Sequence, residues 1–342
     1  MAEKSPDIVQ WKKLFEAMSK IKKIAPWEYF EEDDIFAVQN TATGELGFVS
    51  IMGAIGEHFA IAVYLGEQGL YGFWDLHESL TDELSYNKVF EVPQLQASFE
   101  NRNMLQPHEH KLIKNLGLFF QGKNSWPMFR SIHSGYYPWY LDSKEALFLQ
   151  YVLEQTIDVI TRCEDDFSLL MPGDDDTYFL RKGTEQGGTM VWQDSTLTMI
   201  PQMPIKEIAV DMQAIGTLKK LVSGDISLEI DLFVMNEPLQ DKKDARPYFP
   251  YVLLMIDEDT GDIVNFRLLQ PLPSFESMWG SVPAEITNML AQLKILPLEI
   301  FVSSERLYQL LSPVTKNLHI SLELVEKLPD IDNVRNKLMD FM

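Results

Sequence analysis

Cysteine is almost missing from this 342-residue sequence, in which Cys163 is the only one. One cysteine can form neither an intrachain disulfide nor a zinc site built from cysteines. Long apolar runs are missing too, since the most apolar stretch, residues 51–65, is interrupted by Glu57 and His58. This stretch is too short to cross a bilayer as a helix. Because no apolar core of a signal peptide follows the first six residues, we expect a cytoplasmic protein without a membrane segment.

Positive charge is also scarce. Lysine and arginine number 29 against 51 aspartates and glutamates, which gives a net charge of −22. Such a surface repels phosphate backbones and anionic lipids at long range, so we expect neither nucleic acid nor a membrane as the partner, although a local basic patch could still bind nucleic acid. The obvious basic stretch is the opening helix, which we interpret as a solvated face. Its cations are Lys12, Lys13, Lys20, Lys22 and Lys23.

Signatures of catalysis are missing as well. The sequence contains no Gly-x-Ser-x-Gly, so it lacks the nucleophile elbow of many hydrolases. It also contains neither Gly-x-x-x-x-Gly-Lys-Ser/Thr nor Gly-x-Gly-x-x-Gly, the two loops that bind phosphates. Cys163 lies at the carboxyl end of an expected helix, opposite to the end that stabilises a thiolate. We therefore predict no catalytic residue and no cofactor, and we favour a protein that is not an enzyme.

One close pair of histidines, His108 and His110, could suggest a metal site. Pro107 favours a helix at this point, because proline is suited to the first helical position. In a helix, alternate side chains diverge by about 200°, so the two imidazoles would not share a face. We interpret the pair as part of a solvated helix start.

The turn Asp257–Gly261 resembles two known motifs only in part. A calcium loop needs glycine at its sixth position and glutamate at its twelfth, whereas Gly261 is fifth and Leu268 twelfth here. Asp259-Thr-Gly261 also matches the aspartic-protease triplet, which needs a second carboxylate that the comparable turn at Gly44 does not supply. We interpret this segment as an exposed hairpin turn.

Length and composition are typical of a globular protein with two domains, since 46% of the residues are hydrophobic and 23% are charged. We predict an α+β amino-terminal domain, made of helices and an antiparallel meander, over residues 1–165. A connector with two strands follows over residues 166–204. An α/β carboxyl-terminal domain with a mixed sheet is expected over residues 205–342.

Hydrophobic periodicity gives the expected elements. In the amino-terminal domain these are a helix from residue 8 that ends at Pro26, strands over 35–39, 46–54 and 59–65, a helix over 70–76, a strand over 94–102, and helices over 107–116 and 143–163. The connector strands are 178–181 and 189–199. In the carboxyl-terminal domain we expect a helix over 211–221, strands over 227–235, 251–256 and 263–269, a helix over 283–293, a strand over 298–302, a helix over 305–311, a strand over 319–324 and a helix over 332–341.

An aromatic segment between residues 126 and 140 stands out. Aromatic side chains with a polar group are enriched at interfaces, where one face must be apolar and the other wet. We therefore take this segment as the candidate surface for a ligand, a protein partner or a second copy of the chain; the alternative is that it wedges the long helix 143–163 against the sheet. The candidates are Trp126, Tyr136, Tyr137, Trp139 and Tyr140.

Two resemblances cover most of the chain. The opening, through Trp11-Lys-Lys-Leu-Phe15, Pro26-Trp27, Asp34-Ile-Phe36 and Val63-Tyr-Leu-Gly66, is similar to an uncharacterised bacterial family of unknown function. The carboxyl part, around Tyr248-Phe-Pro-Tyr-Val-Leu-Leu-Met-Ile-Asp257, is similar to a second such family. Neither resemblance implies an activity.

The order of elements in the carboxyl half also resembles the ribonuclease H-like fold. That resemblance implies a metal-binding acid on the first strand, at Asp231, and a second on the first helix, at Glu285; Asp257 is a further candidate. The third acid of the family would stand where this sequence has Ser303 and Ser304. Two-metal hydrolysis needs several carboxylates, so the resemblance points to a degenerate scaffold. We predict a binding or regulatory protein, with a metal-dependent hydrolase or nuclease as the alternative.

Overall fold

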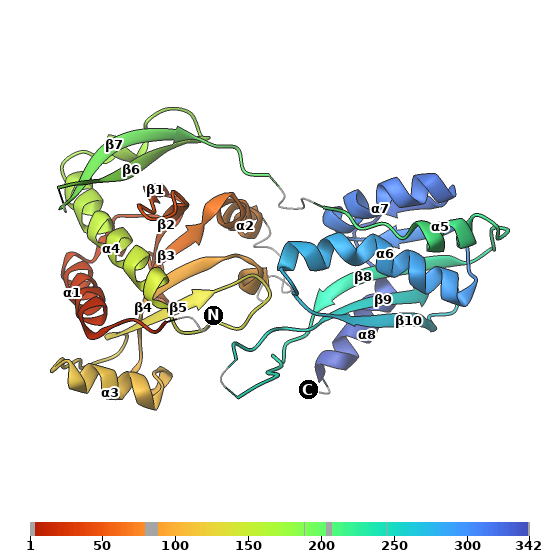
Figure 1. Ribbon diagram of the computed structural model, residues 1–342, viewed down its shortest axis with the longest axis horizontal. Helices are drawn as coiled ribbons and strands as arrows, with labels where there is room; N and C mark the ends of the chain where they lie inside the picture. The colour runs from red at the N-terminus through yellow and green to blue at the C-terminus, as the bar shows by residue number, and fades with distance from the viewer. Residues whose placement is uncertain (1–3, 79–87, 188, 203–206, 244, 341–342) are drawn as a thin grey trace. The chain divides into compact units, whose positions relative to one another are not determined.

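The computed structural model describes residues 4–78, 88–187, 189–202, 207–243 and 245–340. The chain forms two compact units (Figure 1). The first comprises Met1–His133 and Pro138–Met203, and the second comprises Ser134–Tyr137 and Pro204–Met342. Each unit has one mixed sheet and its own apolar core. The architecture is therefore α+β in two parts.

The first unit is built on a seven-stranded sheet with the order β5-β4-β3-β2-β1-β6-β7. All neighbouring strands are antiparallel except β1 and β6, which are parallel. The strands are β1 Phe36–Gln39, β2 Leu46–Met52, β3 Phe59–Leu65, β4 Gln94–Glu100, β5 Trp126–Ile132, β6 Thr177–Gln186 and β7 Thr189–Thr198.

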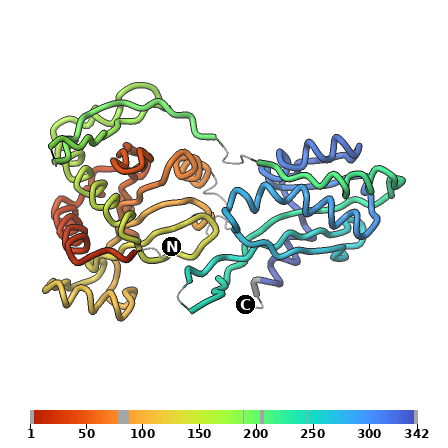
Figure 2. Tube along the Cα trace, in the orientation of Figure 1, coloured from red at the N-terminus to blue at the C-terminus, as the bar shows by residue number. Residues whose placement is uncertain are grey.

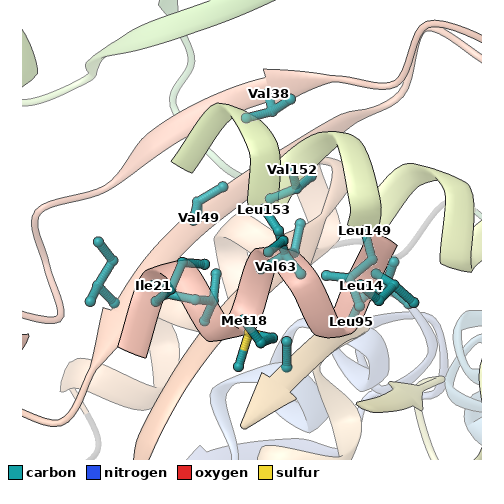
Figure 3. Packing of buried hydrophobic residues seen from close by; sticks show 14 of the residues in the cluster. Leu14, Met18, Ile21, Val38, Val49, Val63, Leu95, Leu149, Val152 and Leu153 are labelled. Atoms are coloured by element: carbon teal, nitrogen blue, oxygen red, sulfur yellow. The ribbon is translucent and has the colours of Figure 1, made fainter. Parts of the chain in front are cut away.

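Helices cover both faces of this sheet. On one face, α1 (Ile8–Ile24) and α4 (Ser143–Cys163) pack side by side over β1 to β4, as Figure 3 shows. Asp7 and Asp142 begin these helices by accepting hydrogen bonds from their first-turn N–H groups. The residues labelled in Figure 3 are Leu14, Met18, Ile21, Val38, Val49, Val63, Leu95, Leu149, Val152 and Leu153. On the other face, α2 (Gly66–Glu78) buries Leu70 and Phe73. A further helix, α3, spans Pro107–Asn115.

The sequence predicted most of these elements but missed β5. From Trp126 to Ser131 this strand alternates half-buried and buried side chains, which is the two-residue period of a strand. Pro127 and the aromatic residues obscured that period. Proline is tolerated in β5 because this strand lies at the edge of the sheet, where one row of donors needs no partner.

The expected connector, residues 166–204, contains the two expected strands, but these strands belong to the first unit. Its two strands, β6 and β7, are antiparallel neighbours along their whole length and form a hairpin, which lies in the green part of the tube in Figure 2. β6 pairs with β1 through Ala37 and Val38, so the hairpin extends the first sheet. Periodicity indicates that a strand exists but not which strand it joins, and therefore the segment could not be assigned to a domain from sequence.

The second unit is built on a five-stranded sheet with the order β10-β9-β8-β11-β12. β8 Ser227–Val234, β9 Tyr251–Asp257 and β10 Ile263–Leu269 are antiparallel neighbours. β11 Glu299–Val302 and β12 Ser321–Leu324 continue the sheet in parallel with β8. Successive residues of β8 point to opposite faces, so Ile230 and Asp231 belong to different layers.

Four helices cover the two faces of this sheet. α5 Met212–Leu218, α6 Phe275–Leu293 and α7 Glu305–Leu318 enclose the larger core with Leu228, Ile230 and Leu232. α8 Pro329–Asp340 lies on the opposite face, where Ile331 packs with Phe233. α6 begins eight residues before the expected start at Pro283, because Ser274 accepts a hydrogen bond from the N–H of Ser277 and so caps the helix there.

Candidate functional site

The aromatic segment does not lie within a single unit. The chain leaves the first unit after His133, contributes Ser134–Tyr137 to the second, and returns at Pro138. Within the second unit, the N–H of Tyr137 donates to the carbonyl of Pro247 at 2.9 Å, and Gly135 accepts from the N–H of Phe249 at 2.9 Å. Residues 134–137 are thus held by backbone hydrogen bonds as part of the second unit.

Tyr136 and Tyr137 are the two candidate residues in this short segment. The hydroxyl of Tyr136 donates to the carbonyl of Pro271 at 3.3 Å, and its ring lies 6.5 Å from that of Tyr248. Tyr137 lies 6.1 Å from the ring of Phe249 but remains 44% exposed. Of the two, Tyr137 therefore offers the more accessible ring.

The other three candidates, Trp126, Trp139 and Tyr140, belong to the first unit. Trp126 contacts the imidazole of His110 at 5.6 Å. Trp139 pairs through its backbone with Ser131, and its ring lies 4.9 Å from Tyr140. All three are half-buried. The five candidates are thus divided between the two units, and their role as a partner surface stays a prediction.

Glu109 lies between His108 and His110 in α3 and has partners of its own. This carboxylate caps α3 through the N–H of Gln106 at 2.8 Å and binds the guanidinium of Arg130 at 2.6 and 3.2 Å. The two histidines beside it contact different rings. The ring centroid of His108 lies 4.5 Å from that of Tyr140, and the ring of His110 contacts that of Trp126. Each ring contacts an aromatic side chain, where the sequence suggested only a solvated helix start.

A polar cluster that the sequence did not predict surrounds Glu145 at the start of α4. Its Oε1 accepts from the hydroxyl of Ser131 at 2.6 Å and lies 3.0 Å from Nε2 of His133. Its Oε2 accepts from the N–H of Asp142 at 2.8 Å. Burial alone would raise the pKa of Glu145, but the bonds to His133, Ser131 and Asp142 outweigh it, so the pKa is lowered.

The geometry of this cluster favours positioning over nucleophilic catalysis. In a serine-histidine-carboxylate triad, the hydroxyl donates to the imidazole, which removes its proton. Here Ser131 and His133 both bind the carboxylate of Glu145, so no base is aimed at the hydroxyl through these bonds. The cluster fixes β5 to the first turn of α4. Ser131 and His133 are two residues apart at the end of β5, and residues two apart in extended chain share a face. This spacing could have predicted the cluster if β5 had been recognised.

Cys163 has the environment expected of a structural cysteine. Its side chain is buried at the carboxyl end of α4. Burial raises the pKa of the thiol to about 11, so very little thiolate exists at neutral pH.

In the second unit, Asp231 is paired with an arginine. Its carboxylate forms a buried ion pair with the guanidinium of Arg335 from α8, and it also accepts from the N–H of Leu232 at 2.9 Å. Arg335 lies over the ring of Phe233 at 4.9 Å and reaches Asp332 at 3.4 Å. Burial raises the pKa of Asp231, and the charge of Arg335 opposes that shift.

The neighbouring acid on β8, Glu229, also has a defined structural partner. Its Oε2 accepts from the backbone N–H groups of Asp330 at 3.2 Å and Ile331 at 3.0 Å, in the first turn of α8. A carboxylate at this position interacts favourably with the helix dipole. Glu229 and Asp231 therefore both join β8 to α8, Glu229 at the first turn of the helix and Asp231 at Arg335.

The structure does not bring Asp231, Asp257 and Glu285 together. Asp257 ends β9, where its Oδ1 accepts from the N–H groups of Asp259 at 3.0 Å and Thr260 at 3.2 Å. Glu285 lies on α6, which packs on the face opposite to Asp231 and α8. Within the described ranges, no three His, Cys, Asp or Glu side chains form a group that could hold a metal ion.

Family models match both the amino-terminal and the carboxyl-terminal part of the chain. Residues 11–181, half of the sequence, match the family described as domain of unknown function (DUF7309). The chain belongs to this family. The DUF7309 match begins inside α1, contains α4 and the Glu145 cluster, and ends inside β6.

A second family match covers much of the carboxyl-terminal part of the chain. Residues 214–339 match the family described as domain of unknown function (DUF6930), and this range includes both Asp231 and Arg335. The similarity of each half to a family of unknown function is therefore confirmed. No curated protein and no solved structure matches the DUF7309 chain. In the part of the chain that the structure describes, no helix is long and apolar enough to span a membrane.

Proposed function

We propose that this protein is a cytoplasmic binding or regulatory protein without catalytic activity, and that its second unit is a ribonuclease H-like fold that has lost its metal site. The strand order β10-β9-β8-β11-β12 supports the second part. Three antiparallel strands are followed by two strands parallel to the first, with a helix after each of β10, β11 and β12. This likeness is one of fold and by itself carries no activity.

The observation that carries the proposal is the ion pair between Asp231 and Arg335. A carboxylate that binds Mg²⁺ or Mn²⁺ must present its oxygens to the cation. At Asp231 one oxygen binds the guanidinium and the other binds the N–H of Leu232. A cation entering here would have to displace Arg335 from Asp231 and so break a buried ion pair, which is costly.

The surrounding acids support the same conclusion. Glu229 is bound to the start of α8, and Asp257 closes the turn after β9. Two-metal chemistry places its ions about 4 Å apart and needs several carboxylates directed at one point. The three candidate acids are instead separated: Asp231 is paired with Arg335, Asp257 binds its own turn, and Glu285 lies on the opposite face of the sheet.

Isothermal titration calorimetry with Mn²⁺ and with Mg²⁺ tests this proposal. We expect no binding to the wild-type protein at millimolar metal. Arg335→Met should bind no metal either, because Glu229 and Asp257 remain in their own contacts. It should also lower the free energy of unfolding by about 3–5 kcal/mol, since it leaves Asp231 buried without its partner.

The alternative, a metal-dependent hydrolase or nuclease, makes the opposite prediction. Millimolar or tighter binding of Mn²⁺ to the wild-type protein, abolished by Asp231→Asn and retained in the matched turn variant Asp259→Asn, would contradict our proposal. Asp259 is a suitable control because its side chain is exposed and lies on the same unit.

A further inference from the structure

The fold assembles a cationic patch from three stretches that are distant in sequence. Asn124 is the point at which they meet. Its carbonyl accepts from Nζ of Lys22 in α1 at 3.1 Å, and its N–H donates to the side chain of Asn101 at 3.2 Å. Lys23, Arg102 and Lys123 directly adjoin these three residues along the chain, so cations from α1, residues 101–102 and residues 123–124 lie close together.

Aromatic contacts beneath the patch hold α1 against residues 120–126. Phe15 of α1 stacks on Phe120 with ring centroids 5.9 Å apart, and Phe120 lies 6.0 Å from Trp126. Arg102 lies over the ring of Trp126 at 5.7 Å, and Lys22 lies over the ring of Phe99 at 5.2 Å. Lys22 and Arg102 therefore each make a cation–π contact with an aromatic ring.

The charge of this region is opposite to that of the whole chain. Residues 8–24 and 101–124 together carry nine lysines and arginines against two glutamates, a net charge of +7, whereas the remainder of the chain carries −29. One of the two glutamates, Glu109, is bound to Arg130. Salt screens exposed charges beyond about 8 Å at physiological ionic strength, so a ligand at the patch experiences the local positive charge more than the distant negative charge.

The side chains of the patch favour a phosphate backbone over an acidic protein. Lys23, Arg102, Lys114 and Lys123 are exposed. Lysine is depleted at protein–protein interfaces but is a common partner of nucleic-acid phosphates. Phe119, in the same segment, is 82% exposed, and an exposed ring beside cations can stack on an unpaired base.

We infer that this patch of the first unit binds single-stranded nucleic acid, which replaces the expectation from the net charge that nucleic acid is not a partner and the interpretation of the opening helix as a solvated face. Lys23, Arg102 and Lys123 contact the phosphates, and Phe119 stacks on a base. The inference gives a ligand class to the proposed binding function and rests on it. It concerns different residues from the Asp231–Arg335 pair, so a failure here leaves the metal experiment, and the conclusion drawn from it, unaffected.

Fluorescence anisotropy with a labelled 20-nucleotide oligo(dT) tests this inference on the full chain. We expect binding at 50 mM salt that weakens steeply as salt is added, because phosphate contacts release counterions. The double variant Lys23→Gln/Lys123→Gln should bind at least about tenfold more weakly. Its plot of log affinity against log salt should be less steep by about 1.4, since each lost contact contributes roughly 0.7 for a single strand.

Matched variants separate a local site from general charge. Lys219→Gln/Lys220→Gln changes the net charge by the same amount at two exposed lysines of the second unit, and it should leave affinity unchanged. Phe119→Ala should weaken binding about fivefold or more without changing the salt dependence.

Three results would overturn the inference. One is the absence of binding at 50 mM salt. Another is an equal loss of affinity in the two lysine double variants. The third is displacement of the oligonucleotide by poly-glutamate at lower concentration than by unlabelled oligo(dT), which would assign the patch to an acidic protein.

Discussion

At the scale of single residues, the charged groups that could have formed a site are mostly engaged in holding elements together. Glu109 joins α3 to β5, Glu145 joins α4 to β5, and Asp231 joins β8 to α8. Each of these acids also binds a backbone N–H close to it in sequence, but the side chain that joins it to another element is distant in sequence, by 21 residues for Glu109, 14 for Glu145 and 104 for Asp231. A buried carboxylate read from sequence as a metal ligand can thus equally be one half of a helix-to-sheet contact.

Glu145 gives a prediction at this scale that depends on pH. Because its pKa is lowered in the folded state, its ionised form stabilises the protein above the unfolded pKa near 4.5, and this contribution is lost as pH falls through the lower folded value. Glu145→Gln should therefore lower the free energy of unfolding by about 1–3 kcal/mol at pH 7.

Urea denaturation of wild type and Glu145→Gln, repeated between pH 7 and pH 3, measures this effect. The difference between the two proteins should shrink as the pH falls below 4.5. A difference that stays constant over this range would show that the cap and the packing matter, and not the charge. Glu154→Gln, on the same helix, is the control for a general effect of removing charge.

At the scale of elements, the close approach of α6 to the segment before α5 predicts a strong effect of one methyl group. A Cβ on Gly280 would lie 2.1 Å from the carbonyl oxygen of Glu207, and the carbonyl of Gly280 accepts from the N–H of Ala209 at 2.8 Å. Gly280→Ala should therefore displace this segment and lower the free energy of unfolding by about 1–3 kcal/mol.

The control is Gly216→Ala in α5, where a Cβ meets no atom within 4 Å. Because alanine is a better helix former than glycine, this variant should stabilise the protein by up to about 1 kcal/mol. Thermal unfolding of both variants gives the comparison. Equal effects of the two substitutions would contradict the steric explanation.

Much of the secondary structure could be predicted from the sequence, for reasons that are local. α1 and α4 combine an aspartate cap with regular apolar spacing, and β8 to β10 are apolar runs separated by turn residues. The sites could not be predicted in the same way. Partners such as Arg335 for Asp231, 104 residues apart, or Asn124 for Lys22, 102 residues apart, are set by packing, which no local pattern records.

At the scale of the whole molecule, the aromatic segment predicts assembly into a homodimer or with another protein. Tyr137 and Trp139 are the residues to change, since Tyr137 is 44% exposed and Trp139 lies next to Tyr140. If the segment forms a homodimer, Tyr137→Ala and Trp139→Ala should each weaken it about tenfold or more, because truncated aromatic anchors are typical hot spots.

Size-exclusion chromatography with light scattering over a range of concentrations measures this. Tyr29→Ala serves as the control, since Tyr29 is similarly exposed, at 38%, but lies outside the segment. A dimer that both segment variants leave unchanged would remove the aromatic residues from the interface.

The excursion of Ser134–Tyr137 has a consequence for how the two halves can be separated. These four residues are hydrogen-bonded within the second unit, yet the chain on either side of them is part of the first. A single cut of the backbone between Met203 and Pro204 would divide the chain into an amino-terminal and a carboxyl-terminal fragment. The amino-terminal fragment would still supply the four residues that the carboxyl-terminal fragment needs, so the nicked halves should stay associated. The carboxyl-terminal fragment expressed alone would lack these four residues of its own unit.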